Sequence, residues 1–107
     1  MTQAGIQQQD SHTALVSGVI DVTTATGLKS EGEALLKKLE NTVVIDLSGI
    51  EHSDSVGVSV LLVWMRAAAR LDKNIQFRDM PPKMFDVARV SGLDAVFPLI
   101  YSSAVRS

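Results

Sequence analysis

The stretch VVIDLSGIEHSDSVGVSVLL, residues 43–62, decides the fold of this chain. It opens with a dense β-branched run without polar alternation, which is typical of a central strand that is covered on both faces. Residues 48–53 are polar and predict a connection, and apolar residues at helical spacing begin just after Ser55. The stretch therefore predicts a buried strand, a polar loop and then a helix over residues 55–70.

The segments on either side extend this alternation of strands and helices. Upstream, residues 13–17 and 19–20 flank Gly18 and predict a short strand pair or one bent strand, and residues 23–39 predict an amphipathic helix. Downstream, residues 75–78 predict a strand, residues 82–90 a helix that starts at a proline, and residues 96–100 a last extended segment. We expect an α/β sandwich with a mostly parallel sheet of four or five strands and helices packed against it.

The length and composition fit one packed domain. With 107 residues, 46% hydrophobic and 21% charged, the chain can bury one core. Residues 1–12 are polar and Gln-rich and predict a flexible leader, residues 13–101 the domain, and residues 102–107 a short tail. The most apolar run, residues 56–65, is much shorter than the roughly 20 residues that span a membrane, so we expect no membrane crossing.

Charge and cysteine content exclude several function classes. The net charge is -2, and no cluster of Lys or Arg could neutralise a row of phosphates, so nucleic acid is not an expected partner. The chain has no cysteine, which removes disulfides, thiolate nucleophiles and cysteine-based zinc sites.

Residues of catalytic type cluster at the polar connection. His52, Ser53, Asp54 and Ser55 include every residue type of a hydrolytic triad, but four consecutive residues on one loop cannot easily face one another. His12 and His52 are the only histidines and do not have metal-ligand spacing. We therefore expect no enzyme activity, no metal site and no cofactor.

The helix over residues 55–70 has two different sides. At about 100° per residue, one side collects Val56, Val60, Leu61, Trp64, Ala67 and Ala68, which should pack on the sheet. The other side carries small hydroxyls, aliphatics and arginines, a mixture that resembles a protein interface: Ser55, Ser59, Leu62, Val63, Arg66 and Arg70. We expect this outward stripe to bind a partner; the alternative is a surface helix with incidental exposed aliphatics.

Ser55 has two further interpretations. A hydroxyl in the first turn of a helix lies where free backbone N–H groups and the helix dipole tolerate an added anion, so Ser55 is a possible phosphorylation site. The simpler alternative is that its hydroxyl caps the helix.

With the segments VSGVID before it and VSGLDAVFPLI after it, the opening stretch resembles the STAS domain, the fold of bacterial anti-sigma factor antagonists and of sulfate-transporter cytoplasmic regions. The resemblance covers residues 13–100. In anti-sigma factor antagonists the matching turn usually reads Asp-Ser-Ser-Gly, and a partner kinase phosphorylates the second serine. Val56 occupies that position here.

A second branch of the family has a hydroxyl, a small or apolar residue and then Gly at this turn. Asp54-Ser55-Val56-Gly57 looks like that branch, the stand-alone STAS subunit of the Mla phospholipid-transport ABC system. The resemblance implies a non-enzymatic cytoplasmic accessory subunit that binds the ATPase and supports its assembly and activity. Ser55 would make the contact, and Asp54 and Gly57, which shape the turn, would belong to the same partner-binding site. The inner membrane would be reached only through the complex.

Two other functions stay open at this point. One is an anti-sigma factor antagonist, whose partner would be an anti-sigma kinase and whose phosphosite could be Ser55. The other is a hydrolase that uses His52 and Ser55.

Overall fold

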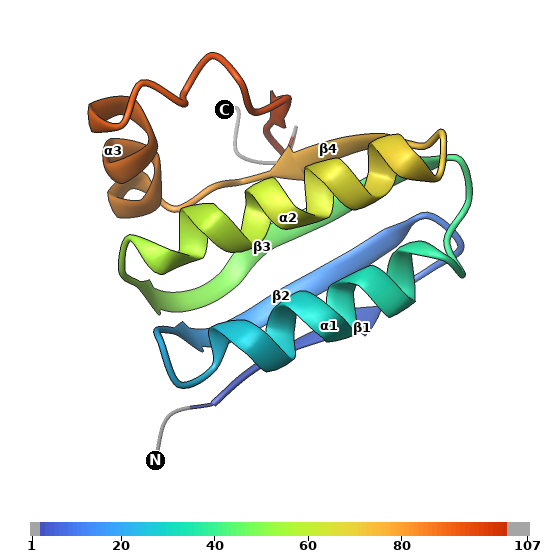
Figure 1. The fold of residues 1–107 in the computed structure, drawn as a ribbon, viewed down its shortest axis with the longest axis horizontal. Coiled ribbons are helices and arrows are strands. Elements are labelled where there is room, and N and C mark those ends of the chain that lie inside the picture. The colour runs from blue at the N-terminus through green and yellow to red at the C-terminus, as the bar shows by residue number, and fades with distance from the viewer. Residues whose placement is uncertain (1–2, 103–107) are drawn as a thin grey trace.

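A five-stranded sheet forms the centre of the computed structural model, which describes residues 3–102 (Figure 1). Its strands lie side by side in chain order: β1 (Ala4–Gln8), β2 (Thr13–Ile20), β3 (Thr42–Ser53), β4 (Asn74–Arg78) and β5 (Leu99–Ile100). β1 is antiparallel to β2, and the other neighbours are parallel. The predicted α/β fold with a mostly parallel sheet is confirmed.

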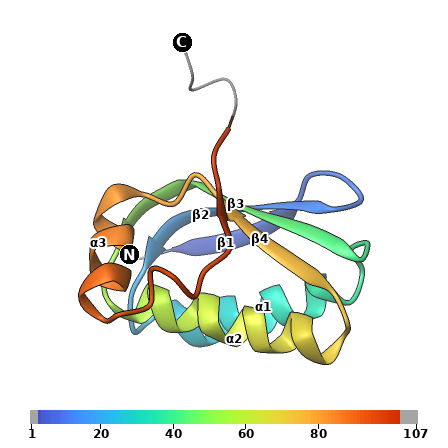
Figure 2. The same cartoon turned by 90° about the horizontal axis from the view of Figure 1, so that it is seen from above.

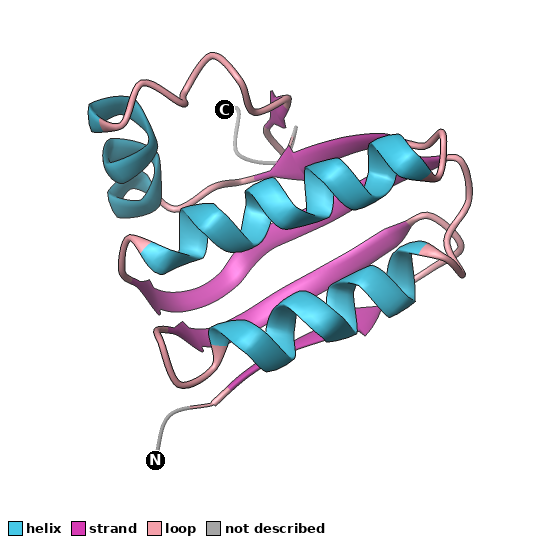
Figure 3. Ribbon diagram, in the orientation of Figure 1, coloured by secondary structure: helices cyan, strands magenta, loops and turns pink. Residues whose placement is uncertain are grey.

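The helices are α1 (Ala25–Leu36), α2 (Val56–Arg70) and α3 (Pro82–Val90). Figures 1 and 2 show α1 and α2 next to each other on the same face of the sheet, while α3 stands beyond the end of β3. Figure 3 shows how α1 links β2 to β3 and α2 links β3 to β4, as parallel neighbours require. No helix between residues 3 and 102 is both long and apolar enough to cross a membrane.

The core lies between the sheet and the two long helices. On β3, Val43, Ile45 and Leu47 are all buried, because alternate residues of a strand point to the same face. Trp64 of α2 is 1% exposed and packs against α1 at Gly32, where a Cβ atom would lie 2.1 Å from the indole Nε1. Gly32 leaves room for the Trp64 indole, so the two helices can approach each other. The side of α2 opposite Trp64 then faces solvent.

The prediction of a flexible leader is wrong for residues 4–8. These residues form β1, whose ladder is continued by a hydrogen bond from the Val19 N–H to the Gln3 carbonyl at 2.8 Å and by one from the Gln9 N–H to the Thr13 carbonyl at 2.8 Å. Backbone hydrogen bonds hold this strand, and Ile6 packs against the core. Its Gln-rich sequence therefore did not predict a strand. Residues 1–2 of the predicted leader and residues 103–107 of the predicted tail lie outside the described residues.

The predicted polar connection over residues 48–53 is also wrong, because β3 continues through it to Ser53. This half of β3 pairs with the second half of β2, which is one strand that bends at Gly18, where φ is 95°. Gly49 allows the close approach, since a Cβ there would lie 2.6 Å from the Val16 carbonyl oxygen. β3 therefore carries the chain directly to the turn before α2.

Candidate partner-binding site

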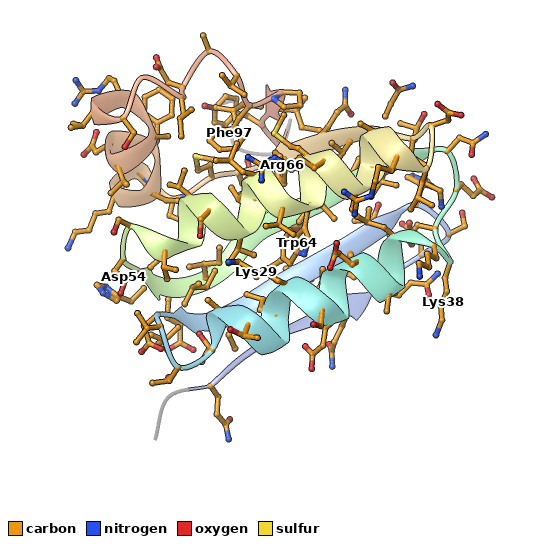
Figure 4. All side chains as sticks on the ribbon, viewed as in Figure 1. Lys29, Lys38, Asp54, Trp64, Arg66 and Phe97 are labelled. Carbon is orange, nitrogen blue, oxygen red and sulfur yellow. The ribbon has the colours of Figure 1, made fainter. Side chains whose placement is uncertain are left out.

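The turn between β3 and α2 is built around Asp54. The Asp54 Oδ1 accepts a hydrogen bond from the Val56 N–H at 2.9 Å, and the Asp54 carbonyl accepts one from the Gly57 N–H at 3.0 Å. The Ser53 hydroxyl also donates to the Asp54 carbonyl, at 3.0 Å. Asp54, which Figure 4 labels, thus satisfies two of the N–H groups at the start of α2, one through its side chain and one through its carbonyl.

Ser55 occupies the N-cap position of α2, but its side chain makes no capping hydrogen bond. The interpretation of Ser55 as the capping hydroxyl is therefore wrong, because the carboxylate of Asp54 performs this role. Ser55 is exposed, and its hydroxyl has no hydrogen-bond partner among the residues that the structure describes. The hydroxyl is therefore available to a partner or a modifying enzyme.

Gly57 is buried, in contrast to its predicted place among the partner-contacting residues. A Cβ atom at this position would lie 2.0 Å from the Ser53 Oγ and 3.0 Å from the terminal methyl group of Met84. Gly57 therefore lets the turn pack closely on β3 and α3.

The predicted stripe along α2 is exposed unevenly. Arg66 is exposed and forms no ion pair within the described part of the chain. Leu62 and Val63 are half-buried and pack against the core with part of their surface. Ser59 is half-buried as well, and its hydroxyl donates to the Val56 carbonyl at 2.7 Å, so it is already used within the helix.

The last turn of α2 adds one residue that the sequence analysis missed. Ala69 is exposed, and its position three residues after Arg66 and seven after Leu62 was the available signal. Arg70 is exposed and reaches α1, where its Nη2 lies 3.2 Å from the Glu33 Oε2. We define the α2 surface by its accessible members, Ser55, Leu62, Val63, Arg66, Ala69 and Arg70.

The opposite side of α2 packs as predicted. Val60, Leu61, Trp64, Ala67 and Ala68 are buried, and only Val56 is half-buried. Figure 4 shows Trp64 and Arg66 on opposite sides of the helix. The helical period thus separates a core-facing side from a solvent-facing one.

The residues of catalytic type do not converge. His52 is exposed, and no hydrogen bond within residues 3–102 joins it to Ser53 or Ser55. The Nδ1 of His12 lies 3.7 Å from the Asp10 Oδ1, far from this turn in the chain. No group of three or more His, Cys, Asp or Glu side chains in the described structure is placed to hold a metal ion.

Comparisons with known proteins place this geometry in a family. Residues 4–101 match a family model described as "Mlab, STAS domain". BtrV of Bordetella bronchiseptica, described as a "Putative anti-sigma factor antagonist", is 27% identical over 89 residues, which are 83% of this chain and 77% of BtrV.

Two solved structures are similar over most of their length. A crystal structure of an anti-sigma factor antagonist from Mycobacterium paratuberculosis has a TM-score of 0.72 and 27% identity, and the match covers all of this chain and 96% of that one. A chain of the Acinetobacter MlaFEDB complex in an ATP-bound conformation has a TM-score of 0.73 and 27% identity, over 82% of this chain and 93% of that one. Since the family model spans nearly the whole fold, the chain belongs to the STAS domain family.

Proposed function

We propose that this protein is a non-enzymatic accessory subunit of an ABC-type phospholipid transport system of the Mla kind. Through the α2 surface it binds the cytoplasmic ATPase and supports the assembly and activity of the complex. It needs no cofactor, and it is held at the inner membrane by its partners. The similarity to a chain of the MlaFEDB complex and the match to the MlaB-type family model support this proposal.

The observation that carries the proposal is the residue at the first position of α2. The resemblance to anti-sigma factor antagonists places their phosphorylated serine at Val56, which has no hydroxyl and is half-buried. The preceding hydroxyl, on Ser55, is exposed and free of hydrogen bonds to described residues. A lasting contact that uses Ser55 and the aliphatic and basic side chains behind it suits this turn better than a phosphorylation switch at position 56.

Affinity capture from native membranes tests the proposal. The tagged chain should recover an ABC ATPase, and Leu62→Asp or Arg66→Glu should abolish the recovery, because each places an acid on the α2 surface. Val22→Asp and Lys38→Glu are matched controls: both positions are exposed and lie outside this surface. Equal recovery with all four variants, or no ATPase with the native chain, would overturn the proposal.

The second candidate function is that of an anti-sigma factor antagonist. BtrV and the Mycobacterium paratuberculosis protein carry this description and match as closely in identity. Here the partner would be an anti-sigma kinase, and the phosphate acceptor would be Ser55. The intact mass of the protein purified from its own cells separates the two functions: a stoichiometric phosphate that disappears in Ser55→Ala would favour the antagonist.

A further inference from the structure

The second half of β3 has an open edge. β4 pairs with β3 only as far as the register of Asp46 with Arg78, whereas β3 continues to Ser53. On its other side, this half of β3 is paired with β2. No backbone hydrogen bond in the described structure joins residues 48–53 to residues 79–84. The Ser48 N–H donates to the Asp46 Oδ1 at 2.9 Å, so it is the rest of this edge that can accept another strand.

A groove follows this edge. It consists of two cavities of about 380 and 440 Å³ that share Ile50, Pro81 and Pro82 in their lining. Ile50 is buried, and so are Met84 in the first cavity and Met80 in the second, which gives the groove an apolar floor. We call this the β3 groove; it runs from Ser53 to Tyr101, whose side chain is 64% exposed at the far end.

Opposite charges stand on the two walls of the first cavity. Glu51 comes from β3 and Lys83 from the start of α3, and both line this cavity and are exposed. Neither forms an ion pair with any described residue. A ligand that carries a base toward β3 and an acid toward α3 would therefore find complementary charge on each wall.

We propose that the β3 groove binds an extended peptide segment of a partner protein, which adds to the sheet as a strand beside residues 48–53. The backbone of the peptide pairs with the open edge, and an apolar side chain contacts Ile50 and the two prolines. A basic side chain faces Glu51 and an acidic one faces Lys83. Addition of a strand to a free sheet edge is a general mode of peptide recognition. This inference concerns a surface other than the α2 surface and does not rest on the proposed function.

The probes are synthetic heptapeptides that alternate Val and Thr. One is uncharged, one carries a Lys near one end and an Asp near the other, and one contains two prolines and cannot form a strand. Amide spectra of the isotope-labelled full chain should shift at residues 48–53, at Lys83 and at Tyr101 with the first two peptides. The charged peptide should bind more tightly than the uncharged one, and the proline peptide should not bind.

N-methylation distinguishes strand addition from mere insertion of an apolar side chain. In a strand, alternate amides point to opposite sides, so methyl groups on one alternate set should abolish binding while those on the other set leave it unchanged. Ser48→Arg should weaken binding by about tenfold, because it fills an exposed position in the groove. Lys38→Glu, at an exposed position outside both the β3 groove and the α2 surface, should bind as the native chain does.

Three results would overturn the inference: no shift with any peptide at millimolar concentration, shifts centred on α2 or β1, or equal tolerance of both N-methylation patterns. Tyr101→Ala provides a second variant if Ser48→Arg does not fold. Unchanged peptide affinity in whichever of these two variants folds would also overturn the inference.

Discussion

Replacing Gly32 by alanine should destabilise the protein, although alanine is the better helix former. Gly32 lies within α1, where intrinsic propensity favours alanine by about 1 kcal/mol. The new Cβ, however, would lie 2.1 to 2.5 Å from three atoms of the Trp64 indole, which is 1% exposed. Overpacking of this kind costs about 1 to 3 kcal/mol, and displacing the indole also breaks its 3.2 Å hydrogen bond to the Lys29 carbonyl.

We expect a net loss of about 2 to 4 kcal/mol in the free energy of unfolding, because the buried indole N–H would lose its partner as well. Urea denaturation followed by circular dichroism measures it, and thermal melting should show about 4 to 8 °C for each kcal/mol. Gly27→Ala is the matched control: it lies in the same helix, with no atom within 4 Å of the added Cβ. It should stabilise the chain by a few tenths to about 1 kcal/mol. If Gly32→Ala is as stable as Gly27→Ala, the account of how α1 orients α2 is refuted.

Three further predictions concern single contacts. Asp54→Ala should lower the free energy of unfolding by about 0.5 to 2 kcal/mol, because it removes the side-chain cap of α2. Ser55→Ala should leave the free energy of unfolding unchanged. Urea denaturation measures both, and equal effects would contradict the assignment of the cap to Asp54. Lys73→Met should destabilise the chain by about 1 to 3 kcal/mol, since the Lys73 ammonium donates to the carbonyls of Leu36, the last residue of α1, and of Leu39, just beyond the helix. An unchanged melting temperature would contradict this. Burial raises the pKa of Asp46, but hydrogen bonds from Ser48 and Arg78 outweigh it and hold the pKa below the ordinary 3.8. The ionised Asp46 carboxylate therefore stabilises the fold above pH 3.8, and this stabilisation is lost as the pH falls through the lowered pKa. Native protein and Asp46→Asn should therefore differ in stability at pH 6 and converge in acid; a constant difference down to pH 2 would argue against the shift.

The helical period in the sequence predicted which side of α2 is buried. Steps of 100° over residues 55–70 separated a buried set around Trp64 from a set around Arg66 whose members are exposed or half-buried. The period does not report which hydroxyl is free, because that depends on side-chain hydrogen bonds. Asp54 and Ser55 are both good capping residues by type, and only the geometry shows that the carboxylate caps α2.

The errors fall where tertiary pairing decides the structure. β1 has a Gln-rich sequence and exists because its backbone pairs with β2. The second half of β3 is polar because one of its edges and part of its surface face solvent. Its sequence therefore resembled that of a loop and was predicted as one. Glycine is a residue type typical of surface turns, yet Gly57 is buried because Ser53 and Met84 pack against it. In each case the deciding contact comes from another part of the chain, which local pattern cannot reveal.

Photo-cross-linking from position 55 in living cells tests the central claim most directly. With p-benzoylphenylalanine in place of Ser55, the account predicts a cross-link to the ATPase of an ABC transporter. The same group in place of Val22, which is 76% exposed and lies outside the α2 surface, should give none. A cross-link from position 55 to a soluble kinase, or equal ATPase cross-linking from both positions, would contradict the claim.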